Sequence, residues 1–136
     1  MPETTASRKT RSATNATMTE TTTRQFKNKM NQLHQEVLGH KHGPIFNAAV
    51  RASDAPGYYD VVKRPMDLKK IKANIKNGTI RTIDDFQRDL YLMFCNAMMY
   101  NKPTSEVHHM AEEMMEWCEG KISDYKNAEA LATSRS

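Results

Sequence analysis

The chain has 136 residues, which is enough for one ordinary domain and too few for two of typical size. Only 38% of the residues are hydrophobic and 7% are aromatic, so a modest core must rely on aliphatic side chains and ten methionines. Alternating strand patterns are nearly absent, and five glycines leave little turn punctuation. These features favour an all-α domain and argue against a strand-rich fold.

The net charge of +4 is unevenly distributed along the chain. Residues 1–30 hold six basic residues against two acidic ones, and the remaining residues hold fourteen of each. The balance in the later part argues against nucleic-acid binding by the domain itself. For the basic leading segment, a weak and salt-dependent contact with DNA and a plain solvated linker both stay open.

The two cysteines lack the neighbours that a metal site or a redox motif requires. Cys95 and Cys118 both lie in apolar helical sequence, which predicts buried free thiols in a reducing compartment. No segment has the length and apolarity of a membrane helix, and the first thirty residues lack the apolar block of a signal peptide. We therefore expect an intracellular protein with no membrane contact.

The first elements in chain order are a tail and a helix. Residues 1–23 are rich in Thr, Ser and Ala, with scattered Arg and Lys and no aromatic residue, and this composition predicts a disordered basic tail. A helix is expected from about Arg24 to His40, ended by glycines. Its inward stripe is Phe26, Met30, Leu33 and Val37.

A long connection, from about Lys41 to Met66, separates this helix from the next. It shows no strong helical period, but it is too apolar for a disordered loop, so it is expected to pack on the bundle. Its apolar residues are Ile45, Phe46, Val50, Pro56, Tyr58, Tyr59, Val61 and Val62. A packed long loop beside a short polar turn predicts a pocket at one end of the bundle.

Three more helices follow. The second is expected to begin after Asp67 as its N-cap and to end at Asn77-Gly78. The third begins at Thr82 with an acidic variant of the capping box and stops at Tyr100, and the fourth runs from Thr104 or Ser105 to about Tyr125. Residues 127–136 are expected to form a flexible tail. Short links between the later helices favour antiparallel neighbours, so the prediction is a left-handed four-helix bundle.

Two stretches carry a resemblance to a known family. PGYYDVVKRPMDLKKIKANI (56–75) and FQRDLYLMFCNAMMYNKPTSEVHHMA (86–111) resemble a bromodomain, the module that recognises acetyl-lysine. The resemblance covers nearly all of the chain expected to be ordered, and it places a bromodomain at residues 24–126. More loosely, the spelling G-Y-Y-D-V-V-K-R-P-M-D-L is similar to bromodomain subunits of histone acetyltransferase complexes of the NuA-four type.

The resemblance implies a role for each residue of the expected pocket. Asn101 would donate an amide N–H to the acetyl carbonyl, and Tyr58 would hold a water that bridges to the same oxygen. Asn96 is expected to bond the backbone of the long loop. The remaining lining residues would be Phe46 and Val50 at the floor, Val107 at the mouth, Tyr100 on another side, Pro44 and Ile45 at the shelf, and Ala55 on a wall. The alternatives are a helix C-cap for Asn101 and plain core packing for each apolar residue.

Two departures from the family pattern affect the pocket. The usual Trp-Pro-Phe shelf is here Pro44-Ile45-Phe46, without the tryptophan, and the stretch between Val50 and Tyr58 is about two residues shorter than in many members. The pocket is therefore expected to be wider and less apolar. Because a fully buried aliphatic side chain contributes about 1.5–3 kcal/mol, the lost contacts predict weak binding.

The fourth helix and its start are strongly acidic. Residues 106–124 hold Glu106, Glu112, Glu113, Glu116, Glu119 and Asp124 against Lys121 alone. Most of these alternate with the inward stripe and are expected to form a solvated face. Glu106, five residues after Asn101, is expected at the rim of the pocket, where it would attract a basic tail.

The resemblance implies a nuclear binding module without a cofactor or metal, not an enzyme. Its partners would be acetylated histone tails and a multi-subunit chromatin complex. The histidine pairs His40-x-His42 and His108-His109 do not converge as a metal ligand pair, and the sequence has no phosphate loop or nucleophile elbow. The alternative is a degenerate bromodomain that docks in a complex without binding acetyl-lysine.

Overall fold

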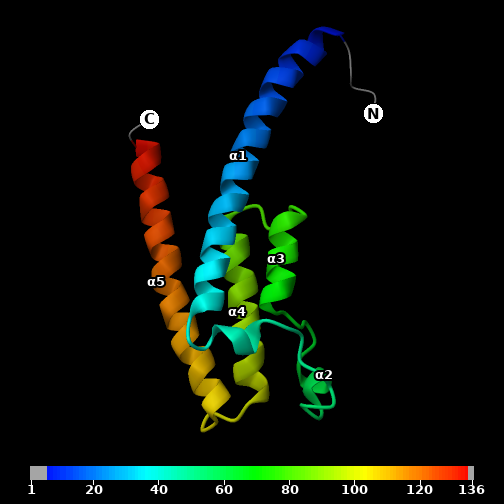
Figure 1. The fold of residues 1–136 in the computed structure, drawn as a ribbon, viewed down its shortest axis with the longest axis vertical. Coiled ribbons are helices and arrows are strands. Elements are labelled where there is room, and N and C mark those ends of the chain that lie inside the picture. Colours follow the sequence, from blue (N-terminus) through cyan, green and yellow to red (C-terminus); the bar gives the residue numbers. More distant parts are fainter. Residues whose placement is uncertain (1–5, 135–136) are drawn as a thin grey trace.

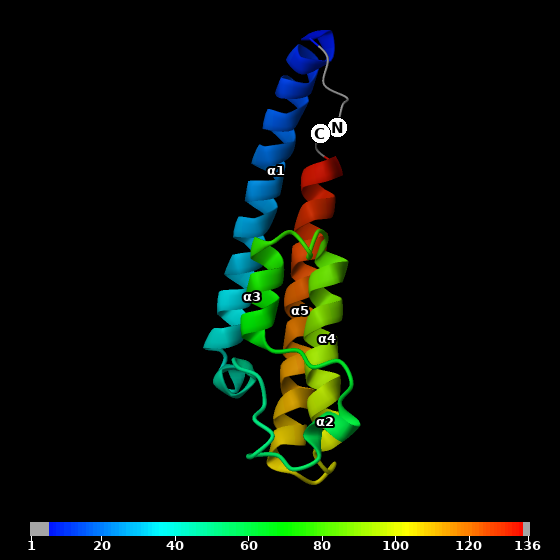
Figure 2. The same cartoon turned by 90° about the vertical axis from the view of Figure 1, so that its right-hand side faces the viewer.

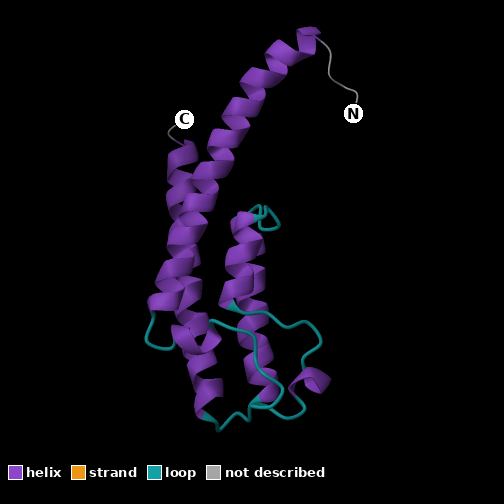
Figure 3. Cartoon of the chain, turned by 45° about the vertical axis from the view of Figure 1, so that its right-hand side comes forward, coloured by secondary structure: helices purple, strands orange, loops and turns teal. Residues whose placement is uncertain are grey.

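Four long helices form an antiparallel bundle in the computed structural model, which describes the backbone of residues 6–134 and the side chains of residues 22–133 (Figure 1). They are α1 (Ala6–Gly39), α3 (Leu68–Lys76), α4 (Ile83–Tyr100) and α5 (Glu106–Ser134). A 3₁₀ helix, η1 (Gly43–Phe46), and the short helix α2 (Tyr58–Val61) lie in the connection between α1 and α3. Residues 6–134 contain no strand (Figure 3), so the all-α four-helix prediction is confirmed.

Side-chain caps define the starts of α3 and α4 where the sequence predicts them. The Asp67 carboxylate accepts the Lys70 amide at 2.8 Å, and the Thr82 hydroxyl accepts the Asp85 amide at 3.1 Å. Asp85 accepts the Arg81 amide at 2.9 Å, one residue before the cap. These contacts satisfy backbone donors that a helix start leaves without partners.

The outer ends of α1 and α5 differ from the prediction. The sequence predicts a disordered segment up to residue 23 and a flexible tail from residue 127, but α1 starts at Ala6 and α5 continues to Ser134. Neither extension contains a glycine or a proline, so nothing in the local sequence stops the helix. The N-terminal half of α1 projects past the end of the bundle (Figure 1). Residues 1–5 and 135–136 lie outside the described range.

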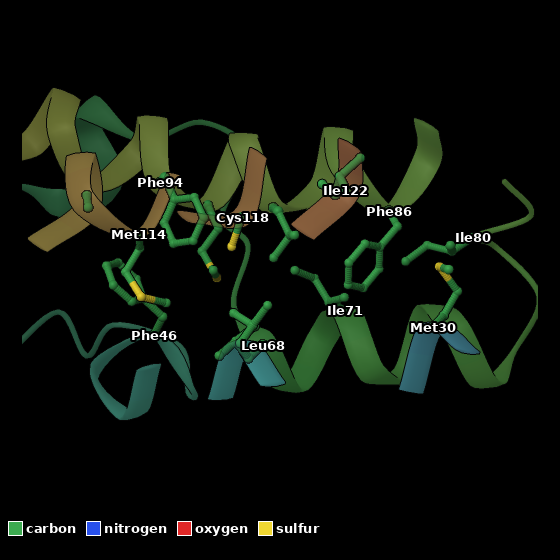
Figure 4. Packing of buried hydrophobic residues seen from close by; sticks show 14 of the residues in the cluster. Met30, Phe46, Leu68, Ile71, Ile80, Phe86, Phe94, Met114, Cys118 and Ile122 are labelled. Atoms are coloured by element: carbon green, nitrogen blue, oxygen red, sulfur yellow. The ribbon is translucent and has the colours of Figure 1, made fainter. Parts of the chain in front are cut away.

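One continuous hydrophobic core joins the four helices (Figure 4). Its fully buried side chains include Met30, Leu68, Ile71, Phe86, Leu90, Phe94 and Met114. Cys118 is 1% exposed within this core, as predicted, but Cys95 is exposed, so its predicted burial is wrong. Cys95 lies between the inward residues Phe94 and Ala97 on α4, where the helix turns its side chain to solvent.

The long connection is fastened to the bundle at several points. Asn96 on α4 donates to the Arg64 carbonyl at 2.8 Å, which confirms its predicted anchoring role. The Tyr100 hydroxyl donates to the Pro56 carbonyl at 2.8 Å, and the Tyr59 hydroxyl donates to the carbonyl of Val50. Phe46, Tyr58 and Val62 are buried, which confirms that the connection packs. No helix within residues 6–134 has the length and apolarity needed to span a membrane.

Candidate ligand-binding site

A cavity of about 320 Å³ lies where the α1–α3 connection meets the C-terminal end of α4 and the start of α5. Its apolar lining consists of Ile45, Phe46, Ala48, Val50, Met66, Met93, Ala97, Val107 and Met110. The polar lining consists of Tyr58, Asp67, Asn101 and Glu106. A mostly apolar cavity with a few convergent polar groups is typical of a site that binds a small ligand or a single side chain.

Asn101 combines a cap with a position in the cavity wall. It follows the last residue of α4 in an extended conformation, and its backbone N–H donates to the Ala97 carbonyl at 3.0 Å. Its side-chain nitrogen donates to the same carbonyl at 2.8 Å. Because an amide nitrogen carries two hydrogens, this bond fixes the side chain and leaves a second N–H that can donate to a ligand. The two roles weighed for Asn101 are therefore compatible.

Tyr58 is held in the cavity by a tight turn and by two aromatic neighbours. Gly57, just before it, has a φ of 75°, a left-handed conformation that favours glycine. The Tyr58 ring lies edge-on to Tyr59 and Tyr100, with centroids 5.0 and 5.1 Å away. Burial raises the pKa of Tyr58, and the charges of Tyr59 and Asp67 raise this pKa further. Its hydroxyl therefore stays protonated at neutral pH and can donate a hydrogen bond.

The apolar walls divide into a buried part and an open part. Phe46 is 7% exposed and packs edge-on against Phe94 on α4, with the ring centroids 5.2 Å apart. Val50 is 36% exposed and Ile45 is 51% exposed, so Val50 belongs to the open side and not to the floor predicted for it. Val107 is half-buried, in keeping with a place at the mouth.

Three residues expected in the pocket do not line the cavity: Pro44, Ala55 and Tyr100. Tyr100 supports it from outside, because its ring packs on Tyr58 and its hydroxyl holds the Pro56 carbonyl. Ala55 contributes its carbonyl, which accepts the Tyr58 amide at 3.1 Å. Pro44 occupies the first turn of η1, where a proline needs no backbone donor, and its side chain is exposed.

Comparison with known proteins identifies the family of this chain. Residues 22–113 match the family model described as Bromodomain, which is more than half of the chain. The chain belongs to the bromodomain family. The resemblance seen in the two sequence stretches is thereby confirmed, and the domain boundaries of 24–126 stay a prediction beside the matched range.

Proteins from several organisms are similar to this chain over short parts of their own length. A bromodomain-containing protein of Dictyostelium discoideum is 44% identical over 84 residues, which cover 60% of this chain and 5% of the relative. The SWR1 complex bromodomain subunit bdf1 of Schizosaccharomyces pombe is 40% identical over 63 residues, 46% of this chain and 11% of the relative. Transcription factor GTE4 of Arabidopsis thaliana is 36% identical over 99 residues, 69% of this chain and 12% of the relative. The match therefore spans only a small part of each relative.

The cavity of this bromodomain also includes residues beyond those expected to line its walls. Helical spacing could have identified Ala97 and Met93, because they lie four and eight residues before Asn101 and so share its face of α4. Met110 follows Val107 by three residues on α5, and the same helical spacing applies. Asp67, predicted as a cap, both caps α3 and lines the cavity, and Glu106 lies at the rim as expected.

Proposed function

We propose that this bromodomain binds acetylated lysine in the cavity beside Asn101. Acetylation removes the charge of lysine and leaves a carbonyl acceptor and a methyl group. The carbonyl would accept the second N–H of Asn101, and the methyl group and alkyl stem would lie against Phe46, Met93 and Val107. The observation that carries the proposal is the amide of Asn101, fixed by Ala97 at the edge of an apolar cavity.

The same geometry disfavours unmodified lysine. An ammonium group offers only donors, so it cannot accept the N–H of Asn101 or the hydroxyl hydrogen of Tyr58. Moving its charge into a cavity with mostly apolar walls also costs desolvation energy. Selectivity for the acetylated form therefore follows from two neutral donors and a cavity with mostly apolar walls.

The names of the relatives support a role in chromatin. One is a subunit of the SWR1 complex and another is a transcription factor. We propose that this chain acts in the nucleus as a binding module and not as an enzyme, with acetylated histone tails as its ligands. Membership of a multi-subunit chromatin complex, including a histone acetyltransferase complex, belongs to the same proposal.

Replacing Asn101 tests the function directly. We expect Asn101→Ala and Asn101→Phe to reduce the affinity for an acetylated histone-tail peptide at least about 30-fold, because a central hydrogen-bonding residue of an interface contributes about 2 kcal/mol or more. Titration calorimetry with acetylated and unmodified peptides measures the loss. Asn127→Ala, on the exposed C-terminal part of α5, is the matched control and should bind like the parent protein. Circular dichroism checks that each variant stays folded.

The competing role is a bromodomain that docks in a complex without binding acetyl-lysine. Two observations favour the docking role. Ile45 is exposed where the family has a buried shelf, and Asn101 serves as a helix cap. Equal affinity of the parent protein for acetylated and unmodified peptides, or unchanged binding by Asn101→Ala, would support the docking role and overturn the proposal.

A further inference from the structure

A second concave surface lies between α1 and α3, which run side by side in opposite directions (Figure 2). This hollow, of about 560 Å³, is lined by Arg24, Lys27, Asn28, Asn31, Lys69, Lys72, Ala73 and Lys76. Five of these residues are cations, two are neutral amides and one is alanine. No carboxylate lines it. We call these eight residues the α1–α3 groove.

Helical spacing places the cations of the groove in two facing rows. On α3, Lys69, Lys72 and Lys76 follow each other at intervals of three and four residues, so they share one face. On α1, Arg24 and Lys27 are three residues apart. The Lys27 ammonium donates to the Lys76 carbonyl at 2.9 Å, which joins the two rows and leaves further N–H groups of Lys27 to donate.

The positive charge of the groove is not neutralised within residues 22–133. The ion pairs among these residues use other cations, for example Lys29 with Glu129, Lys121 with Glu36 and Lys126 with Asp84. None of the five groove cations forms an ion pair with a described carboxylate. The side chains of Lys69, Lys72 and Lys76 are exposed, so they are free to meet an external anion.

We propose that the α1–α3 groove binds the phosphate backbone of duplex DNA without sequence preference. Lysine and arginine neutralise phosphates, and asparagine amides such as those of Asn28 and Asn31 donate to phosphate oxygens. The row from Lys69 to Lys76 covers about 10 Å of helix, a length that can reach more than one phosphate, because duplex DNA carries one charge per about 1.7 Å of its axis when both strands are counted. A second hollow shares Lys27 and continues the positive surface to Arg81.

The composition of the groove favours duplex DNA over two other polyanions. Single-stranded nucleic acid is bound through bases stacked on aromatic rings, and the groove has no aromatic residue. A protein segment with acidic residues is usually anchored by apolar or aromatic contacts, and Ala73 is the sole apolar residue of this lining. A polar and cationic surface without aromatic residues is suited to phosphates and not to bases or apolar side chains.

This surface is separate from the acetyl-lysine cavity, since the two share no lining residue. Counts along the sequence do not reveal this surface, because Arg24 and Lys27 fall in the basic leading segment and the three lysines of α3 are offset in the later total by carboxylates, many of which lie on α5. The proposal departs from the prediction, made from charge balance, that the domain itself does not bind nucleic acid. One molecule can engage DNA and an acetylated peptide at the same time.

Fluorescence anisotropy of a labelled duplex, titrated with the full chain over a range of salt concentrations, tests the proposal. We expect a dissociation constant of roughly 10⁻⁴–10⁻⁶ M at physiological salt, as for other non-specific complexes. The triple variant Lys69→Gln/Lys72→Gln/Lys76→Gln keeps similar helix propensities. It should bind at least about tenfold more weakly, and the slope of log K against log salt should fall by about three.

Matched controls separate the groove from charge in general. Lys41→Gln/Lys102→Gln/Lys126→Gln lowers the net charge equally on other surfaces, and Arg8→Gln/Lys9→Gln/Arg11→Gln does so near the N-terminus. Both should keep most of the affinity, and saturation with acetylated peptide should leave DNA binding unchanged. Equal losses in all three variants, loss confined to the N-terminal variant, or displacement of DNA by poly-glutamate at equal charge concentration would each overturn the proposal.

Discussion

At the scale of single residues, His34 shows how the core holds a polar side chain. The ring is 3% exposed, and its Nε2 lies 2.7 Å from the Leu68 carbonyl. A carbonyl can only accept, so Nε2 carries the hydrogen and Nδ1 is unprotonated. Nδ1 is buried and has no hydrogen-bond partner among the side chains and backbone that the structure describes. Protonation would therefore place a second N–H and a charge where neither is solvated, which costs free energy.

Stability should consequently depend on pH through His34. Burial lowers the pKa of His34 below its ordinary value of 6.5, against a smaller opposing effect of the Leu68 hydrogen bond. Between that lowered pKa and 6.5 the unfolded chain binds more protons than the folded one, so the free energy of unfolding should decrease as pH falls through this window. His34→Gln should flatten the curve, measured by urea unfolding from pH 7.5 to 5. His109→Gln, an exposed control, should leave it unchanged. The lowered pKa of His40 accounts for part of the pH dependence that remains in His34→Gln. If the free energy of unfolding of His34→Gln varied with pH as in the parent protein, the pH dependence could not be assigned to His34.

The two cysteines should differ sharply in reactivity. Burial raises the pKa of Cys118 to about 12, and its side chain is 1% exposed, whereas Cys95 is exposed. Because the thiolate is the reactive form, a thiol reagent at pH 8 should modify one cysteine in the folded protein and both in denaturant. Mass spectrometry locates the modified residue. Rapid labelling of Cys118 in the folded protein would show that α5 opens from the core.

The residues of the cavity show which site positions a sequence can predict. Phe46, Tyr58, Asn101 and Val107 are where the resemblance places them, because helix ends and a short turn determine their directions. Pro44, Ala55 and Tyr100 are not, although Pro44 and Tyr100 directly precede residues that line the cavity. In irregular backbone, neighbouring side chains diverge according to turn geometry, which residue spacing does not specify. Whether the six expected residues that do line the cavity contact a ligand stays a prediction.

At the scale of elements, internal starts were predictable and outer ends were not. Asp67 and Thr82 supply side-chain acceptors that specify where α3 and α4 begin, and Asn77-Gly78 ends α3 with a left-handed glycine of φ 84°. The outer ends of α1 and α5 have no such signal, so composition alone suggested loose tails. The junction of α1 with η1 depends on close backbone packing. A Cβ on Gly43 would lie 2.3 Å from the Leu38 carbonyl oxygen and 2.4 Å from that of Val37.

Glycine replacements should therefore have opposite effects at two positions. Gly43→Ala should reduce the free energy of unfolding by about 1–3 kcal/mol, because the clash is with backbone and the junction must shift. It should also weaken acetylated-peptide binding, since η1 carries Ile45 and Phe46. Gly120→Ala lies within α5, and apart from its neighbouring residues and the backbone of its own helix no described atom lies within 4 Å of the new Cβ, so it should raise stability by about 0.5–1 kcal/mol. Chemical denaturation measures both, and a neutral Gly43→Ala would show that the junction adapts freely.

At the scale of the whole molecule, charge is segregated although its sum after residue 30 is zero. The α1–α3 groove is cationic, whereas a hollow beside α5 is lined by Glu112, Glu113, Glu116 and Glu119. Glu106 at the start of α5 brings negative charge to the rim of the acetyl-lysine cavity, and Asp67 adds a carboxylate at its wall. The molecule therefore presents opposite potentials to DNA and to a basic peptide, which favours one orientation between them.

The acidic rim should make binding sensitive to the residues that flank the acetylated lysine. An acetyl-lysine peptide with lysine and arginine neighbours should bind more tightly at low salt than one with serine and glycine neighbours. The difference should be less than about fivefold, because exposed ion pairs contribute roughly 0–1 kcal/mol. It should shrink as the Debye length falls below ~8–10 Å. Titration calorimetry of the two peptides at low and high salt measures both effects.

Two variants test which carboxylate is responsible. Glu106→Gln should remove part of the preference for basic neighbours, whereas Glu119→Gln should retain it, because Glu119 does not line the cavity. Equal affinities at low salt would mean that the acidic side chains of α5 only solvate the surface.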